Sequence, residues 1–219
     1  MLAGEGVVAI WNGIAPEGRA EFYAWHLHEH MPERVGIPGF RRGRRYIAAD
    51  GATAPEFFTL YETDSLQVLQ GQDYANRLNA PTPWTKSATS HFEDTFRSLA
   101  RVVASRGPGS GGALLTLRFD VDDLDALAPD LLACADAPRI CGVHLCAADR
   151  AASDVRTAES RGRSDIRTPP SQFLLIEATD PEAFADLVPE GLLLASGASQ
   201  VTRGIYRLEY TRGKTAWSA

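Results

Sequence analysis

The stretch Arg106-Gly-Pro-Gly-Ser-Gly-Gly112 decides how this chain is organised, because it is the one segment with the composition of a flexible linker. It divides the 219 residues into two halves of nearly equal length. The sequence therefore predicts two domains, one over 1–107 and the other over 108–219.

Both halves repeat the same order of strand and helix signals. In the first half we expect a strand at 7–13, a helix at 16–31, strands at 38–50 and 58–62, a helix at 65–70 and a strand at 92–103. The counterparts in the second half are a strand at 113–119, a helix at 123–135, strands at 138–149 and 173–177, a helix at 181–187 and a strand at 200–210.

The order β-α-β-β-α-β is that of a ferredoxin-like unit, which places both helices on one face of an antiparallel sheet. The other face stays apolar, and a half of this size would be marginal with that face bare. We therefore predict an α+β fold in which two tandem ferredoxin-like units cover each other and form an intrachain pseudo-twofold α+β barrel. Two independent domains are the alternative.

The composition, 44% hydrophobic and 23% charged, is that of an ordinary globular protein. No apolar run is long enough to span a bilayer, and the first residues lack a signal peptide, so we expect a cytoplasmic protein without a membrane partner. The net charge of −6 argues against nucleic acid. Cys134, Cys141 and Cys146 lack zinc-ligand spacing and are expected to be reduced.

The candidate site is a histidine cluster in residues 25–39, Trp-His-Leu-His-Glu-His-Met-Pro-Glu-Arg-Val-Gly-Ile-Pro-Gly. On a regular helix His26 and His30 share one flank, whereas His28 points to solvent. Pro32 is expected to end the helix, which places His30 in a last turn whose dipole favours the charged imidazolium. The arc expected to face the sheet is a different one, made by Ala20, Tyr23, Ala24, Leu27 and Met31.

Two functions fit His26 and His30. The pair could share a metal with Glu29 or His91, although the spacing is not His-Glu-x-x-His. General acid/base catalysis by His30 is the interpretation we favour, because imidazole titrates near neutral pH. A structural role at a helix end is the third alternative. No nucleotide-binding loop is present, and no cofactor is expected.

Further candidates lie mainly on the predicted strands. Arg45 and Arg42 could hold an anion, and Tyr46 or Tyr61 could stabilise an oxyanion. An aromatic wall could be formed by Trp11, Trp84, Tyr74 and Phe57, and His91 could face His30. Core packing and a basic sheet edge are the alternatives.

The segment 150–170 is long, polar and rich in arginine. A lid that closes over an anionic ligand is one interpretation. A disordered surface loop is the one we favour, because long structureless segments are more often disordered.

The motif Phe22-x-x-Trp25-x-x-x-Glu29-His30-x-Pro32-Glu33-Arg34, followed by Ile37-Pro-Gly-Phe40 and Arg44-Arg-Tyr46, resembles the EthD-like branch of the dimeric α+β barrel superfamily. Asn79-x-Pro-Thr-Pro-Trp84, with Phe92 and Arg97 downstream, is similar to the close of that domain in tandem members. The resemblance implies a ferredoxin-like fold, a cavity between sheet and helices, small substrates handled without a bound cofactor, and His30 as the catalytic residue.

We therefore predict a cofactor-independent acid/base enzyme of the isomerase, lyase or cyclase type, acting on a small enolisable or aromatic carbonyl compound that is anionic or aromatic. His30 would move the proton. The alternatives are a cofactor-free oxygenase of aromatic or polyketide substrates, a heme- or metal-dependent enzyme, and a non-catalytic small-ligand-binding protein. A homodimer is left open.

Overall fold

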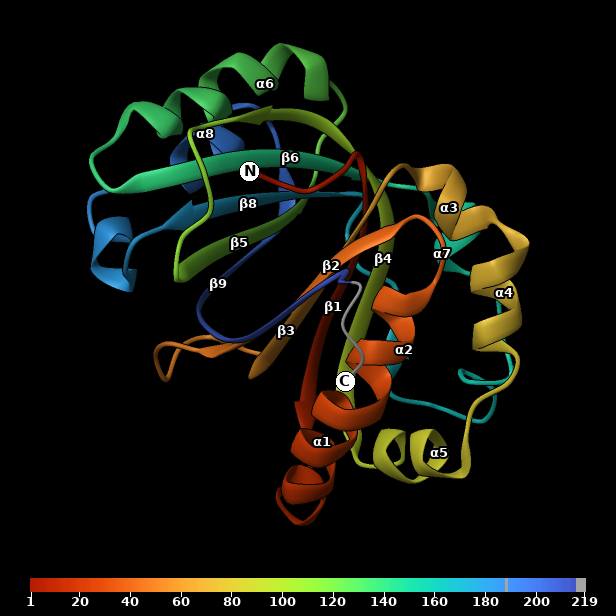
Figure 1. The fold of residues 1–219 in the computed structure, drawn as a ribbon. Helices are drawn as coiled ribbons and strands as arrows, with labels where there is room; N and C mark the ends of the chain where they lie inside the picture. Colours follow the sequence, from red (N-terminus) through yellow and green to blue (C-terminus); the bar gives the residue numbers. More distant parts are fainter. Residues whose placement is uncertain (188, 216–219) are drawn as a thin grey trace.

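Eight antiparallel strands close into a barrel in the computed structural model, which describes residues 1–187 and 189–215 (Figure 1). Around the barrel the strand order is β1-β3-β2-β9-β5-β8-β6-β4, and β4 pairs back onto β1. The strands are β1 (Gly6–Ile14), β2 (Phe40–Ala48), β3 (Phe57–Thr63), β4 (Phe92–Arg106), β5 (Ala113–Asp120), β6 (Ile140–Ala148), β8 (Gln172–Ala178) and β9 (Ser199–Gly213). A short ninth strand, β7 (Ile166–Arg167), runs parallel to β4. The predicted α+β class and the barrel are confirmed.

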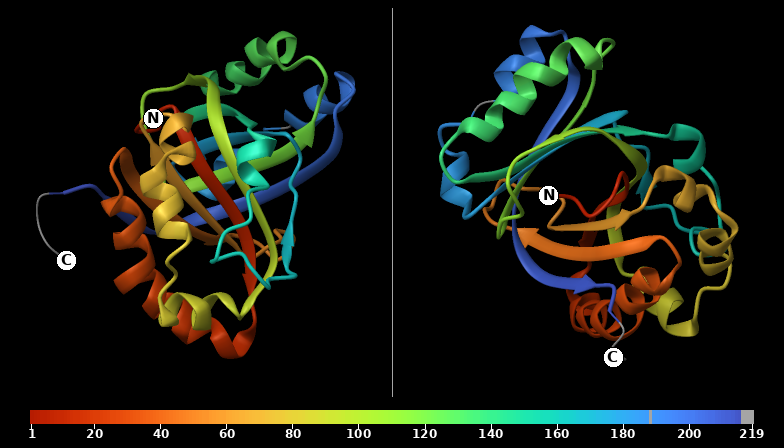
Figure 2. Two further views of the ribbon diagram at one scale, coloured as in Figure 1. Left: turned by 90° about the vertical axis from the view of Figure 1, so that its right-hand side faces the viewer. Right: turned by 45° about the horizontal axis from the view of Figure 1, so that its top comes forward.

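The helices lie outside this barrel (Figures 1 and 2). Along the first half they are η1 (Pro16–Gly18), α1 (Arg19–Trp25), the π-helix η2 (His26–His30), α2 (Met31–Gly36), α3 (Leu66–Gln70), α4 (Gln72–Leu78) and α5 (Pro83–Thr89). Along the second they are α6 (Leu124–Leu132), η3 (Ala133–Asp136), α7 (Arg150–Ser153), η4 (Pro181–Phe184) and α8 (Pro189–Ala195). None of the described helices has the length and hydropathy to cross a bilayer.

One helix of the second half lies at a different position from the one that the sequence predicts. The segment 181–187 was expected to be helical, but only a single 3-10 turn, η4, forms there. The helix that packs beside α6 is α8, further along the chain. The apolar residues of both segments enter the same core, so hydrophobic pattern alone did not separate them.

Two strands of 15 residues each, β4 and β9, close the barrel. Residues 92–101 of β4 pair with β1 of the first half, and residues 100–106 pair with β6 of the second. In the same way, residues 199–207 of β9 pair with β5, and residues 206–213 pair with β2. Because each long strand belongs to both halves, neither half keeps an unpaired edge in the barrel.

Alternation along the strands separates two kinds of core. Side chains that point into the barrel form one cluster, which includes Trp11, Tyr46, Phe58 and Phe173. Side chains that point outward are covered by helices, with α6 and α8 over the second half and α1 to α5 over the first. The functional site lies on the outer, helix-covered face of the first half.

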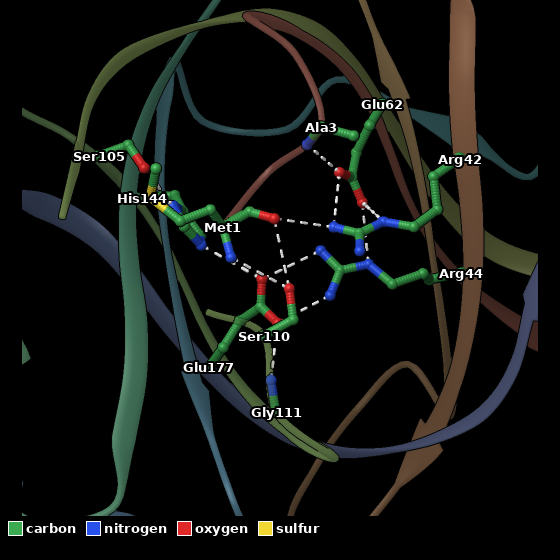
Figure 3. Close-up of polar contacts among 10 residues, drawn as sticks. All are labelled: Met1, Ala3, Arg42, Arg44, Glu62, Ser105, Ser110, Gly111, His144 and Glu177. Carbon is green, nitrogen blue, oxygen red and sulfur yellow. Dashed lines mark hydrogen bonds and ion pairs between the residues drawn. The ribbon is translucent and has the colours of Figure 1, made fainter. Parts of the chain in front are cut away.

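Part of the barrel interior is polar rather than apolar (Figure 3). Arg44 donates to Glu62 at 2.9 Å and to both carboxylate oxygens of Glu177 at 2.7 and 3.1 Å. His144 Nε2 lies 3.2 Å from Glu177. Burial raises the pKa of the Glu177 carboxyl, but the hydrogen bonds and charges of His144 and Arg44 outweigh it and hold that pKa well below its usual range. The buried charges therefore compensate one another.

Candidate functional site

A cavity of about 380 Å³ lies between the outer face of the first-half strands and the helices that cover them. Its floor is formed by Ile10 and Asn12 of β1, Thr59 and Tyr61 of β3, and Thr95 and Arg97 of β4. The walls include Phe22, Trp25, His26, His30 and Arg34 of the first helical segment, and Tyr74 and Leu78 of α4. This volume is in the range of pockets that hold small organic molecules.

The wall that carries the histidines is one helical run from α1 through the π-helix η2 to α2. The run turns Phe22, Trp25, His26 and His30 inward, whereas Leu27 is 37% exposed. The expected arc is therefore correct at Met31, which is buried, and in part at Tyr23, which packs against Phe57 of β3; it is wrong at Ala20 and Leu27, which are exposed. The expectation assumed 3.6 residues per turn throughout, but the bulky aromatic side chains take the buried side and the wider π-turn rotates the positions that follow.

Pro32 does not end this helix. It directly follows the π-helix η2, in the first turn of α2, and the helix continues to Gly36. His30 is consequently in mid-helix and not at a helix end, which removes both the dipole argument and the helix-end alternative. His28 is exposed, as predicted.

The two inward histidines form a close pair. Their exposed fractions are 3% for His26 and 6% for His30, and their ring centroids lie 5.5 Å apart. The indole of Trp25 lies 4.2 Å from the His30 ring, centroid to centroid. The Nδ1 atom of each histidine is buried with no hydrogen-bond partner among the described residues. Because buried polar atoms in proteins are nearly always paired, two unpaired imidazole nitrogens in a cavity wall mark this wall as the candidate site.

Burial also decides the charge of this pair. It lowers the pKa of both imidazoles well below the usual value of 6.5, and the nearby guanidinium charges, Arg45 for His26 and Arg34 for both, lower it further. Both histidines are therefore neutral near pH 7, contrary to the charged His30 that the helix dipole argument favoured. A neutral imidazole can accept a proton, as a general base must.

Tyr61 lies beside this pair, with 6.1 Å between its ring centroid and that of His30. Its hydroxyl is buried and has no hydrogen-bond partner among the described residues. Burial raises the pKa of this phenol, so Tyr61 stays protonated and can donate a hydrogen bond to an oxygen in the cavity.

Arg34 belongs to the motif around His30, but the sequence predicted no role for it in the candidate site. It is 3% exposed, lines the cavity and forms an ion pair with Glu159, which belongs to the second half of the chain. The available signal was its position four residues after His30, which is itself four after His26.

The segment 153–168 covers the cavity and contributes lining residues to it. It is tied to the first half by backbone hydrogen bonds, from Glu159 N to the Leu78 carbonyl at 3.0 Å and from Thr95 N to the Asp165 carbonyl at 3.0 Å, and by the pairing of β7 with β4. In the left view of Figure 2 this stretch runs alongside β4. The expectation of a disordered surface loop at 150–170 is wrong, because these contacts anchor the segment along its length.

Four of the expected strand and aromatic residues lie away from the cavity. Trp11 and Tyr46 point into the barrel, where the Trp11 Nε1 donates to Thr116 at 3.2 Å. Arg42 joins the ionic cluster by binding Glu62 at 2.8 and 2.9 Å (Figure 3). Arg45 lies on the outer face and pairs with Glu209 at 3.0 Å. Alternation on the strand sends Arg45 and Tyr46 to opposite faces, so they cannot share a site.

The other four expected residues are structural. Glu29 accepts hydrogen bonds from Thr82 at 2.6 Å and Thr85 at 3.1 Å, which joins η2 to α5. Trp84 packs against the apolar cluster around Phe22 and Phe57. His91 Nε2 lies 3.6 Å from the Glu21 carboxylate. Phe57 is buried in the same apolar cluster as Phe22 and does not line the cavity. Of the expected residues, the fold brings His26, His30, Tyr61 and Tyr74 together in the cavity.

The expected metal ligands do not assemble either. Glu29 and His91 do not line the cavity with His26 and His30. Within residues 1–187 and 189–215, no group of three or more His, Cys, Asp or Glu side chains is placed to hold a metal ion.

No protein-family model matches the chain, and comparison with proteins of curated function gives no significant match. Solved structures do match. The TM-score is 0.57 for a putative monooxygenase from Lactobacillus acidophilus NCFM, at 10% identity over 95% of this chain and 96% of that one. It is 0.59 for an anthrone oxidase-like protein, at 12% identity over 95% and 92%. It is 0.53 for a mutant chlorite dismutase from Candidatus Nitrospira defluvii, at 10% identity over 94% and 90%. The chain shares their fold. Identities this low establish the fold alone.

Proposed function

We propose that the protein is a cofactor-independent enzyme that removes a proton from a small, planar, enolisable or phenolic carbonyl compound. The observation that carries the proposal is the pair of buried, neutral imidazoles of His26 and His30, whose Nδ1 atoms have no partner among the described residues. Such groups are costly to bury unless a ligand uses them.

In this proposal His30 acts as the general base. The proton of an acidic C–H or O–H bond moves to an imidazole nitrogen of His30. The electron pair of a C–H bond beside the carbonyl passes to the carbonyl oxygen and gives an enolate, whereas that of a phenolic O–H bond stays on its own oxygen and gives a phenolate. The Tyr61 hydroxyl donates a hydrogen bond to the resulting oxyanion. The rings of Trp25 and Phe22 flank a planar substrate. Return of the proton to a different carbon completes an isomerisation. In an elimination the enolate expels a leaving group, which takes the proton. In a ring closure the enolate carbon bonds to a second carbonyl carbon of the same molecule, and the oxygen of that carbonyl takes the proton.

A cofactor-free oxygenase is the second candidate. It is favoured by the likeness to structures described as a monooxygenase and as an anthrone oxidase-like protein. The first step is the same, because the carbanion formed by proton removal is the electron-rich species that reacts with dioxygen. The two candidates therefore differ only in whether the carbanion is reprotonated or oxidised.

The test uses enolisable aromatic ketones and phenols, anthrone among them, with and without a carboxyl substituent. Under nitrogen in D2O, mass spectrometry measures deuterium uptake at the acidic position; in air, an electrode measures oxygen consumption. Deuterium uptake without oxygen consumption supports the first candidate, and oxygen consumption supports the second. Deuterium uptake no faster than in buffer for every probe contradicts both, and a Soret band in the purified protein would replace them with a heme-dependent activity.

His30→Gln is the decisive variant and His28→Gln is its matched control, because His28 lies on the same helical turn but is exposed. We expect His30→Gln to slow exchange by about 10²- to 10⁴-fold and His28→Gln to leave it unchanged. Equal rates for His30→Gln and the wild type would refute the role of His30.

We also infer that the chain is a tandem member of the EthD-like branch, with ferredoxin-like units at 1–107 and 108–219 related by a pseudo-twofold axis. The motif around His30 and the matching roles of β4 and β9 support this assignment. If the units depend on each other, residues 1–107 expressed alone should be unfolded by circular dichroism.

A further inference from the structure

Arg97, on the floor of the cavity, has a guanidinium with no acidic partner among the described residues. Three other arginines that line the cavity are paired: Arg34 with Glu159, Arg163 with Asp165, and Arg167 with Asp94. Arg156, which has no ion pair among the described residues either, is exposed on the covering segment. Among the described arginines that line the cavity, Arg97 is therefore the half-buried one without an acidic partner.

The contacts of Arg97 hold its guanidinium in place without neutralising it. One terminal nitrogen donates to the Tyr74 hydroxyl at 3.0 Å, and the other lies 3.4 Å from the Ser153 carbonyl oxygen. A guanidinium has five N–H donors in a planar fork, so three are left for a ligand. That fork matches the two oxygens of a carboxylate.

The strand register sets the spacing between the backbone of Arg97 and the strand beneath the proposed base. Ile10 of β1 is opposite Thr59 of β3 on one side and Arg97 of β4 on the other. Two strand spacings, about 10 Å, therefore separate Arg97 from the row of β3 that holds Thr59 and Tyr61. This is a spacing between backbones. The Arg97 side chain extends from its strand to Tyr74 and Ser153, His30 lies beside Tyr61, and both Arg97 and His30 line the same cavity of about 380 Å³.

We infer that the cavity binds a planar cyclic or aromatic carboxylate, and that Arg97 is the residue that recognises its carboxylate. The orientation of this ligand, with its acidic C–H or O–H toward His30, rests on the proposed function; the recognition by Arg97 does not. A neutral ligand of the same shape would leave the guanidinium unpaired, so Arg97 also excludes uncharged analogues.

Isothermal titration calorimetry tests this with benzoate and 2-naphthoate against their neutral amides. We expect the wild type to bind at least one carboxylate about tenfold or more tightly than its amide. In Arg97→Met the preference should disappear, while binding of the amide changes little. Arg97→Lys keeps the charge but loses the fork, and should retain part of the preference.

Arg167→Met is the matched control, because Arg167 also lines the cavity but is already paired with Asp94. It should keep the full preference for carboxylate. The inference is overturned if no carboxylate binds, if carboxylate and amide bind equally to the wild type, or if the preference survives in Arg97→Met or is lost equally in Arg167→Met. Circular dichroism establishes that each variant is folded. If Arg97→Met does not fold, Arg97→Lys takes its place in the comparison of carboxylate and amide.

His30→Gln separates this inference from the proposed function. It should bind carboxylates as the wild type does while losing proton exchange. Carboxylate preference in a wild-type protein that exchanges no proton with any probe would support Arg97 as the recognition residue and refute the proposed function. Proton exchange without any carboxylate preference would refute this inference alone.

Discussion

Acid should destabilise this protein as the pH falls below about 6.5, through His26 and His30. Burial lowers the pKa of both imidazoles well below 6.5 in the folded chain, whereas in the unfolded chain each has its ordinary pKa. The unfolded state therefore binds more protons in this window. The free energy of unfolding is fully retained above about pH 6.5 and falls as the pH drops below it, toward the folded pKa.

The magnitude follows from the number of protons. One pH unit below the unfolded pKa, each histidine has lowered the free energy of unfolding by about 1 to 1.5 kcal/mol, so the pair lowers it by about 2 to 3 kcal/mol. This is a large share of the stability of an ordinary domain. The two rings are 3% and 6% exposed, so solvent screens the effect little.

Urea unfolding followed by circular dichroism at half-unit intervals of pH measures this slope. The double variant His26→Gln with His30→Gln removes both groups, and its stability should be flat by comparison over the same range. Exposed His28 provides the control, since His28→Gln should keep the wild-type slope. A wild type without the slope, or a double variant with the same slope, would show that the buried imidazoles are not held neutral.

Two further predictions concern buried ion pairs. Glu177→Gln leaves Arg44 with less compensating charge inside the barrel, and should lower the free energy of unfolding by about 3 kcal/mol; a loss below about 1 kcal/mol in urea unfolding would contradict it. Glu159→Gln releases the covering segment from Arg34, so amide hydrogen exchange over residues 154–168 should speed up about tenfold or more while the barrel strands stay protected. Unchanged exchange in that segment would mean that the ion pair does not hold it.

Much of the fold could be predicted because its elements follow local patterns. Each of these patterns lies within a short stretch of chain: the glycine-rich composition of 106–112, the repeated order of strand and helix signals, and the alternation that marks the apolar sheet faces. The extra length of β4 and β9 was not predictable in this way, because their last residues pair with the opposite half. The π-turn at His26–His30 was also missed, because it depends on packing around the helix rather than on propensity.

The residues of the candidate site also fall into two groups, those that local sequence predicts and those that depend on tertiary contacts. His30, His26 and Tyr61 were found because side-chain chemistry and local spacing mark them. Trp11, Arg42, Arg45 and Tyr46 were misplaced because the face on which a strand residue lies depends on how the barrel closes. Arg34 and Arg97 were quoted but given no role, since their importance rests on which carboxylates are near.

By itself the sequence determined the α+β class, the barrel and the helical segment that carries His26 and His30. Only the tertiary structure shows that the outer face of the first-half strands lines the cavity, which arginines have an acidic partner, and that residues 153–168 cover the cavity. The physical reason is distance along the chain. Arg34 meets Glu159 across 125 residues, and a charge balance set by such a contact cannot be obtained from neighbouring positions.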